Sequence, residues 1–576
     1  MIALFKYLKP YRLFIVTVLT LMFCGIMLEL YLPTLMADLV DKGIADNNIG
    51  YVWRTGGLML LCAVISVALT ILVSYLSSRI TLGFSRDVRK ALFVQVEGLS
   101  LQEFDRFGTA SLITRTTNDI KQVQDVTSMI LGMMTRAPIM LVGGIILAIS
   151  RDAKLSYIFL ASLPVLSLLI FLISRRAIPL FGLLQKKTDK LNLLLRETLI
   201  GTRVVRAFNR VGYEQTRFNE ANEDYRDTGI RVNRILALLF PVMMLVMNFT
   251  SIAIIWFGGI RIDQGEMQVG NLMAFLQYAM MILISLVMLS MAFVSIPRAQ
   301  ASAKRINEVL NINSSIQDNE QAIDMPAADG VDVAFDKVTF HYAGAEKSAL
   351  HNVSFTARAG QTTAIIGSTG SGKSTLLRMI PRFYDVESGK IMFNGIDIRR
   401  IKLDQLRAQL GYVPQKAALF RGTIRDNIRF GNGDVSDQQE QDVLEIAQAA
   451  DFVKAKENGV LDEVSQGGGN LSGGQKQRVS IARALARKPS IYLFDDSFSA
   501  LDYKTDARLR KALKQVTGKA TVIIVAQRVS TVMDADQIIV LHEGEIVGSG
   551  THKQLMESNL IYQEIVQSQQ LEEESV

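Results

Sequence analysis

A glycine-rich run that ends in lysine, serine and threonine carries the clearest chemistry in this sequence. It reads Gly367-Ser-Thr-Gly-Ser-Gly-Lys-Ser-Thr375, the spacing of a phosphate-binding loop. Residues 362–366 precede it as a predicted buried strand, and residues 376–380 follow it as a predicted helix. Glycines let backbone N–H groups close around phosphate oxygens, and a helix N-terminus favours negative charge. The context therefore predicts an ATP site.

Each side chain of the loop has an expected part in that site. We expect the Lys373 ammonium to reach the β- and γ-phosphates and the Ser374 hydroxyl to bind Mg²⁺. The candidate ATP contacts of the loop are Gly367, Ser368, Thr369, Gly370, Ser371, Gly372, Lys373, Ser374 and Thr375. Tyr342 lies about 25 residues earlier, where its ring either stacks on adenine or is a surface tyrosine.

Two adjacent carboxylates supply the expected metal and water chemistry. The apolar stretch 491–495 reads as a strand that ends in Asp495, which suits an aspartate that holds Mg²⁺ through water. Asp496 follows directly, where a general base would stand next to the attacking water. The pair predicts the hydrolytic side of the same site.

A second anion-binding element is predicted at residues 471–475, which read Leu-Ser-Gly-Gly-Gln before a helix. A hydroxyl and glycine amides at a helix N-terminus can hold another phosphate. The candidate contacts are Ser472, Gly473, Gly474 and Gln475.

Composition divides the chain into a membrane half and a water-facing half. The chain has 576 residues, too many for one core, and 49% of them are hydrophobic. The apolar excess lies before residue 300, whereas residues from 331 alternate between strands and helices. We expect an all-α six-helix transmembrane domain at 1–311, a linker at 312–330 and an α/β P-loop nucleotide-binding domain at 331–576. The net charge of +7 is not accompanied by an aromatic-and-basic stripe, so nucleic acid is not expected as a partner.

Six apolar segments are long enough to cross a bilayer at 1.5 Å per helical residue. They span residues 13–35, 55–78, 129–150, 155–174, 235–260 and 269–296. Basic residues precede the first span, and many more lie in the connections 79–128 and 175–234. The positive-inside rule therefore places these parts and the second half in the cytoplasm, and the protein in the cytoplasmic membrane among lipid.

The two inner connections contain few glycines or prolines and show helical spacing. We expect the spans to continue through them as helices, about 37 Å for 25 residues. The turns at 100–107 and 209–218 are predicted to touch nucleotide-binding domains near Gln415 and 463–467. The alternative is a pair of helical hairpins that contact nothing.

Two charged residues and a group of methionines lie within the apolar segments of the membrane half. Glu29 and Arg136 are costly at membrane depth, so each should face an aqueous cavity or the other. Either one binds substrate or forms a structural polar contact. Seven methionines crowd the last two spans and suit either a permissive pocket or contact with lipid. They are Met243, Met244, Met247, Met280, Met281, Met288 and Met291.

Taken together, these motifs resemble those of an ABC exporter half-transporter, and the resemblance covers essentially the whole chain. The loop at 367–375 is similar to Walker A, 491–495 to Walker B, 471–475 to the signature and 499–502 to the D-loop. The resemblance implies that Tyr342 stacks on adenine. It also makes Gln415 the Q-loop residue, which contacts Mg²⁺ and the catalytic site. The segment 463–467 stands where such exporters carry a cross-linking loop.

The resemblance further implies a dimer, in which each ATP lies between the P-loop of one chain and the signature of the other. ATP-driven closure then produces alternating access. Two positions depart from the family pattern: Asp496 replaces the usual glutamate base, and Gln527 replaces the usual switch histidine. Asp is one methylene shorter and Gln does not titrate, so both changes predict slow or absent hydrolysis at this site.

That pattern resembles the degenerate-site subunit of heterodimeric bacterial multidrug exporters. We therefore expect a translocase subunit that exports hydrophobic or amphipathic compounds with a second half-transporter chain, a homodimer being the other possibility. The alternatives are a lipid or peptide exporter subunit and a regulatory ATP-binding membrane protein without transport. No cysteine peptidase domain precedes the first span, which disfavours the peptide subtype.

Overall fold

The computed structural model describes residues 1–290, 292–319, 321–326 and 330–574. Met291 and linker positions 320 and 327–329, on which some expectations above rest, lie outside the described residues. The chain forms two compact units. The first contains Met1–Glu97 and Thr109–Ile312, and the second contains Gly98–Gly108 and Asn313–Val576.

The first unit is built from long helices. Among the described residues, six helical segments are long and apolar enough to cross a membrane: Ile2–Ile44, Ile49–Glu97, Thr109–Arg151, Tyr157–Ile200, Val211–Asp263 and Val269–Leu310. The helix over Ile49–Glu97 has 49 residues and is roughly 73 Å long. The expectation that spans continue as helices through both inner connections is confirmed.

The elements of the first unit follow one another with few breaks. They are η1 (Ile2–Tyr11), α1 (Arg12–Asp38), η2 (Leu39–Ile44), α2 (Ile49–Glu97), α4 (Thr109–Thr114), η3 (Arg115–Asp119), α5 (Ile120–Met129), η4 (Ile130–Met134), α6 (Thr135–Arg151), α7 (Tyr157–Ile200), α8 (Thr202–Ala207), α9 (Val211–Ala237), α10 (Leu239–Asp263), α11 (Val269–Ser290) and α12 (Ala292–Leu310). Segments η2, η3 and η4 are π-helical turns.

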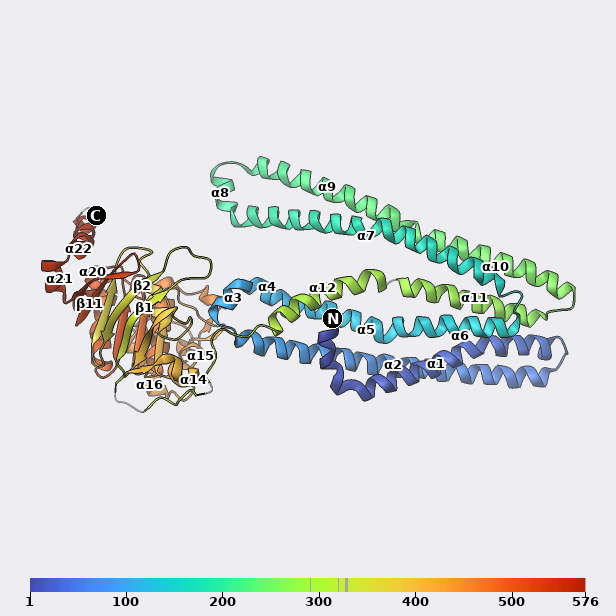
Figure 1. Ribbon diagram of the computed structural model, residues 1–576, viewed down its shortest axis with the longest axis horizontal. Helices are drawn as coiled ribbons and strands as arrows, with labels where there is room; N and C mark the ends of the chain where they lie inside the picture. Colours follow the sequence, from blue (N-terminus) through green and yellow to red (C-terminus); the bar gives the residue numbers. More distant parts are fainter. Residues whose placement is uncertain (291, 320, 327–329, 575–576) are drawn as a thin grey trace. The chain divides into compact units, whose positions relative to one another are not determined.

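Helices of the first unit pack as neighbours along their length. Figure 1 shows α1 beside α2, and α7 beside α9 and α10 in a long hairpin. The main apolar cluster combines side chains from α1, α6 and α11, including Leu30, Met140 and Tyr278. Tyr278 donates a hydrogen bond to the Leu30 carbonyl at 3.1 Å, so its buried hydroxyl has a partner.

The second unit begins with α3 (Leu101–Phe107), a single short helix from the first inner connection. Ser100 and Glu103 form a capping box that starts it. Leu101 packs against the core of this unit, and the Tyr384 hydroxyl donates to the Asp105 carboxylate at 3.4 Å. The predicted turn at 100–107 thus contacts the α/β part of its own chain at Tyr384.

The remaining elements of the second unit alternate strands and helices. They are β1 (Val333–Phe340), β2 (Leu350–Ala357), β3 (Thr362–Ile366), α13 (Lys373–Met379), β4 (Ser388–Phe393), β5 (Ile396–Asp397), η5 (Ile398–Arg400), α14 (Leu403–Ala408), β6 (Leu410–Val413), β7 (Gly422–Thr423), α15 (Ile424–Arg429), α16 (Asp437–Ile446), α17 (Ala450–Lys454), η6 (Gly459–Leu461), β8 (Glu463–Val464), η7 (Gln466–Gly468), α18 (Gly473–Ala486), β9 (Ile491–Asp495), α19 (Tyr503–Val516), β10 (Thr521–Val525), α20 (Val529–Val532), β11 (Gln537–His542), β12 (Glu545–Gly550), α21 (His552–Ser558) and α22 (Leu560–Glu574).

A six-stranded sheet with the order β12-β11-β3-β10-β9-β6 forms the centre of this unit. Strands β11, β3, β10, β9 and β6 are parallel, and β12 is antiparallel at one edge. A smaller antiparallel sheet has the order β2-β1-β4-β5. The expected helical membrane half followed by an α/β half is confirmed.

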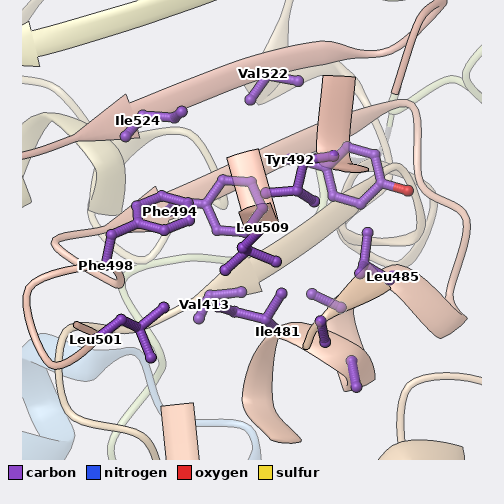
Figure 2. Packing of buried hydrophobic residues seen from close by; sticks show 14 of the residues in the cluster. Val413, Ile481, Leu485, Tyr492, Phe494, Phe498, Leu501, Leu509, Val522 and Ile524 are labelled. Atoms are coloured by element: carbon purple, nitrogen blue, oxygen red, sulfur yellow. The ribbon is translucent and has the colours of Figure 1, made fainter. Parts of the chain in front are cut away.

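Both faces of the parallel sheet are buried, and alternate side chains serve each face. Tyr492 and Phe494 of β9 point into one apolar cluster, whereas Ile491 and Leu493 belong to the other. Figure 2 shows Phe494 packed near Phe498 in the first cluster, with Val413 of β6 and Ile481 of α18 nearby. This packing fixes the end of β9, where Asp495 stands.

Candidate active site

Four parallel strands bring the predicted site together, because their carboxyl ends lie at the same edge of the sheet. Strand β3 leads into the loop at Gly367, and β9 ends at Asp495. Strand β10 is followed by Gln527, and β6 by Gln415. Residues that are up to 160 positions apart in the chain therefore converge on one site.

The phosphate-binding loop requires glycine at three positions. Gly370 and Gly372 have φ values of +84° and +98°, in the left-handed region that glycine adopts freely. A Cβ on Gly367 would lie 2.0 Å from the Leu541 carbonyl oxygen, and one on Gly372 would lie 2.5 Å from that of Ala349. The loop is thus held tightly between neighbouring strands, and α13 begins directly after it.

The polar side chains of the loop suit a phosphate group. The Ser371 hydroxyl is buried and has no hydrogen-bond partner among the described residues. The Lys373 ammonium donates to the carbonyls of Gly367 and Ser368, at 2.7 Å each, so it is folded over the loop. An unpaired hydroxyl beside a lysine is what an anion with several acceptor oxygens would satisfy. The residues present therefore fit ATP.

Two of the three expected Mg²⁺ ligands are in contact with each other, whereas the third, Gln415, donates to Asp496. The Ser374 hydroxyl donates to the Asp495 carboxylate at 2.7 Å. Asp495 is 1% exposed, so its position is fixed by the packing around β9. A hydroxyl and a carboxylate are oxygen donors of the kind Mg²⁺ prefers.

Asp496 lies at the meeting point of two glutamines. Its Oδ2 accepts hydrogen bonds from Gln415 at 3.3 Å and from Gln527 at 3.1 Å. Its φ of +47° places the backbone in the left-handed region, which aspartate tolerates better than most residues. The backbone N–H of Asp496 donates to the Val525 carbonyl of β10 at 2.9 Å and fixes this turn.

Burial sets the electrostatics of these groups. It raises the pKa of Asp495 above its usual range, and the hydrogen bond from Ser374 opposes the rise. It also raises the pKa of Asp496, against hydrogen bonds that include the one from Gln415. Burial lowers the pKa of Lys373, while the two carboxylates favour its charged form. The site therefore holds one cation close to two acids in a space with little water.

Tyr342 is linked to the loop by a hydrogen bond. Its hydroxyl lies 3.1 Å from that of Thr375. Its ring packs edge-on against Phe340 and Tyr384. The tyrosine is half-buried rather than free on the surface, and stacking on adenine stays a prediction.

The predicted second anion-binding motif forms the start of α18. Ser472 caps α18, since its hydroxyl accepts from the Gln475 N–H while the Gln475 side chain accepts from the Ser472 N–H. Gly474 lies against the backbone of Ala500, where a Cβ would be 3.1 Å from the carbonyl oxygen. Ser472 and Gly473 are exposed. The motif thus lies beside the D-loop at 499–502, with its glycine open to solvent.

Two residues near the site were not identified from the sequence. Arg528 donates to the carbonyls of Ser499 and Leu501 and so ties the Gln527 loop to the D-loop. Gln569 of α22 donates to the Gln527 carbonyl at 2.6 Å and accepts from the Val529 N–H at 2.8 Å. Arg528 could have been identified because it follows Gln527 directly. Gln569 is 42 residues from Gln527 and belongs to no recognisable motif, so the sequence gives no signal for it.

The fold and the site together define a multi-pass membrane protein with an attached P-loop ATP-binding domain. The model of the ABC transporter transmembrane region matches residues 13–287, and the ABC transporter model matches residues 350–499.

Whole-chain relatives agree with these matches. The chain is 43% identical over 571 residues to the uncharacterized ABC transporter ATP-binding protein MT1311 of Mycobacterium tuberculosis, covering 98% of this chain and 97% of the relative. It is 30% identical over 569 residues to a putative export ATP-binding/permease protein of Rickettsia typhi, covering 98% of each. A solved bacterial Atm1-family ABC exporter with ATP bound superposes with a TM-score of 0.82 at 26% identity, covering 97% of this chain and 98% of the other. The chain therefore belongs to the ABC transporter family and has the fold of an exporter subunit.

Proposed function

We propose that the chain is one subunit of an ATP-driven exporter that moves hydrophobic or amphipathic compounds out across the cytoplasmic membrane. It acts with a second, different half-transporter chain, and alternating access follows ATP-driven closure of the dimer. The fold of an exporter subunit supports this proposal, as does the export function named for the Rickettsia typhi relative. The departures at Asp496 and Gln527 support a heterodimer.

The contacts of Lys373, Ser371 and Ser374 support the following proposed roles at the ATP site. Lys373 releases its two loop carbonyls and contacts the β- and γ-phosphates, and Ser371 donates to a phosphate oxygen. Ser374, Gln415 and Asp495 hold Mg²⁺, which when bound neutralises charge on the phosphates. Tyr342 packs against adenine, and residues 472–475 contact the ATP on the partner's P-loop.

One observation carries the degenerate-site proposal: Asp496 is a short carboxylate whose Oδ2 accepts from the amides of both Gln415 and Gln527. A general base must reach the proton that it removes, and Asp ends one methylene short of Glu. Gln527 neither titrates nor carries charge, so it cannot substitute for the base. This site binds ATP and hydrolyses it slowly, and the partner's site performs most turnover.

The test is transport in inside-out vesicles that contain the chain with its natural partner. We expect ATP-dependent accumulation of a fluorescent hydrophobic cation, and none with either chain alone. A Lys373→Ala variant should weaken ATP binding at this chain's own site while leaving partial transport, because the partner's site still turns over.

The alternatives give different results in the same vesicles. A regulatory protein would bind ATP and move no compound. A lipid or peptide exporter would move a labelled lipid or peptide from a panel and leave the cation. Full transport by this chain alone would reject the heterodimer.

A further inference from the structure

The first unit contains a cavity of about 480 Å³ between helices α1, α2, α5 and α6, the η4 turn and the end of α11. Its apolar wall includes Leu21 and Ile26 of α1, Val73 of α2 and Met288 of α11. Its polar wall combines a charged pair with a row of hydroxyls. The cavity is thus amphipathic and lies within the predicted spans.

The charged pair consists of Glu29 on α1 and Arg136 on α6, which form an ion pair. The side chains are 28% and 32% exposed, and both line the cavity. The expectation that these residues face a cavity or each other is confirmed on both counts. At membrane depth each charge needs a partner, because an isolated one is strongly unfavourable there. A ligand that separates Glu29 from Arg136 must therefore carry both a positive and a negative charge.

The row of hydroxyls comes mainly from α2, with Ser74, Ser77 and Ser78 on the cavity wall and Ser128 of α5 opposite. The Ser77 hydroxyl is buried, with the residue 7% exposed, and no described residue forms a hydrogen bond with it. A buried hydroxyl without a partner is uncommon in native proteins. A polar group in the cavity would satisfy it.

The helix that carries Arg136 is distorted at this place. The π-helical turn η4 spans Ile130–Met134, and its residues Gly132 and Met133 line the cavity. Single π-turns inside α-helices are frequently found at functional sites. Here the turn ends just before α6, where Arg136 faces Glu29. Three independent features, the ion pair, the orphan hydroxyl and the π-turn, meet in one cavity.

We propose that this cavity binds a zwitterionic amphiphile, with an ammonium group next to an anionic group and an apolar chain. The ammonium contacts Glu29 and the anionic group contacts Arg136, so the ligand replaces each partner of the ion pair at once. A headgroup oxygen accepts from Ser77, and the chain lies on Ile26, Val73 and Met288. A ligand with a single charge leaves one member of the pair without a counter-charge. The proposal rests on the proposed export function, for which it names a substrate class.

Binding of three probes with one chain length tests this selectivity. Tritiated 2-aminodecanoic acid is the zwitterion, and decylamine and decanoic acid are the matched single charges. The probes are added to the assembled transporter in lipid nanodiscs, and binding is measured by scintillation proximity. We expect the zwitterion to bind about ten-fold more tightly or better than either single charge. Equal or tighter binding of decylamine or decanoic acid would overturn the proposal.

Variants place the binding in this cavity. Ser77→Ala should weaken binding of the zwitterion about five-fold, the usual effect of one lost hydrogen bond. Ser162→Ala is the matched control, since Ser162 is also a buried serine of the spans without a described partner, but it does not line the cavity. Equal effects of the two variants would overturn the assignment.

Charge variants test the ion pair. Glu29→Gln should remove the preference for the zwitterion and raise the affinity for decanoic acid, because Arg136 is then free for an anion. The control is Lys187→Gln, which opens the ion pair that Lys187 forms with Asp224 outside the cavity. Thermal unfolding of each variant shows that it is folded, and an unchanged preference in folded Glu29→Gln contradicts the proposal.

Binding and transport distinguish failure of the cavity assignment from failure of the export function. Zwitterion binding with no ATP-driven movement of any compound rejects the export function and leaves the cavity assignment intact. Export of a hydrophobic cation without zwitterion binding rejects the cavity assignment and leaves export intact.

Discussion

Asp495 is a buried acid, and we propose that its charge serves to bind a metal ion rather than to stabilise the fold. Burial raises its pKa, so the folded protein takes up a proton more readily than the unfolded chain does. At a pH above both pKa values, the ionised carboxylate therefore lowers the free energy of unfolding. This destabilisation decreases as the pH falls through the raised pKa. The hydrogen bond from Ser374 offsets part of it.

Replacing this acid by its amide separates stability from Mg²⁺ binding. Asp495→Asn should unfold in EDTA at the same temperature as the wild type or a higher one at pH 7. It should need about 10–100-fold more Mg²⁺ for ATP to raise the unfolding temperature, as when a group that orients metal ligands is lost. Thermal unfolding against Mg²⁺ concentration measures both effects.

The control for that variant is Asp506→Asn, which changes another buried aspartate whose pKa burial raises, in the first turn of α19. Its Mg²⁺ dependence should equal that of the wild type. An unchanged Mg²⁺ requirement in Asp495→Asn would show that this carboxylate does not hold the metal.

At the scale of elements, α3 links the first inner connection to the core of the second unit. Leu101 packs on that core, and the Tyr384 hydroxyl donates to Asp105. Burial and the neighbouring Asp105 carboxylate raise the pKa of Tyr384 to about 12, so this hydroxyl stays protonated and able to donate at physiological pH. We propose that this short helix transmits movement of the ATP-binding domain to the chain on either side of it.

A charge at Leu101 should break that transmission. In Leu101→Asp the carboxylate would face an apolar cluster, which is unfavourable without a partner. We expect basal ATPase activity within about two-fold of the wild type, but loss of transport and of its stimulation by substrate. Leu560→Asp, at an exposed leucine of α22, is the control and should do neither. Normal stimulated activity in Leu101→Asp would show that α3 is not the coupling contact.

Features that depend on the spacing of residues close together in the chain could be predicted from the sequence. The strand–loop–helix at 362–379, Asp495 at a strand end and the helical continuation of the spans all follow from periodicity and motif. The convergence of Gln415 and Gln527 on one oxygen of Asp496 depends on strand order and rotamers, and neither is written in the spacing. The π-turn at Ile130–Met134 was missed because an apolar run looks the same in a π-turn and an α-helix.

At the scale of the whole molecule, the second inner connection has exposed apolar side chains at the turn between α7 and α9. Ile200, Val204 and Phe208, at the turn around α8, are 81%, 61% and 75% exposed. Such side chains at the tip of a long helical hairpin suit a protein contact. We propose that this turn, which lies just before the predicted contact stretch 209–218, contacts the nucleotide-binding domain of the partner chain.

Cysteine cross-linking tests this contact in the assembled dimer. With Cys24 and Cys62 replaced by serine, Phe208→Cys should cross-link to a cysteine in the Q-loop region of the partner chain. Asp227→Cys, exposed on α9 well beyond the turn, is the control and should remain free. No cross-link from Phe208→Cys in any nucleotide state would reject the contact.

A difference in hydrolysis rate between the two ATP sites is also a property of the whole molecule. In the proposed dimer, the P-loop, Asp495, Asp496 and Gln527 build the slow site, and the exposed signature glycine Gly473 faces the ATP of the competent site. Loss of a well-placed general base costs about 10²–10⁴-fold in rate. On the degenerate-site proposal, Asp496 already lacks much of that advantage. Asp496→Asn should therefore change the ATPase rate of the dimer by less than about three-fold.

A change at the signature should have the opposite result. A Cβ at Gly473 meets no atom within 4 Å among the described residues, so Gly473→Asp is tolerated by its own chain and acts on the partner's ATP through its charge. It should abolish most turnover, about 10²-fold or more, because one misplaced charge spoils the stabilisation of the phosphates. Gly433→Asp, at another open glycine, should have no effect. If Asp496→Asn abolishes turnover as fully as Gly473→Asp does, then Asp496 is a working base and the two sites are equivalent.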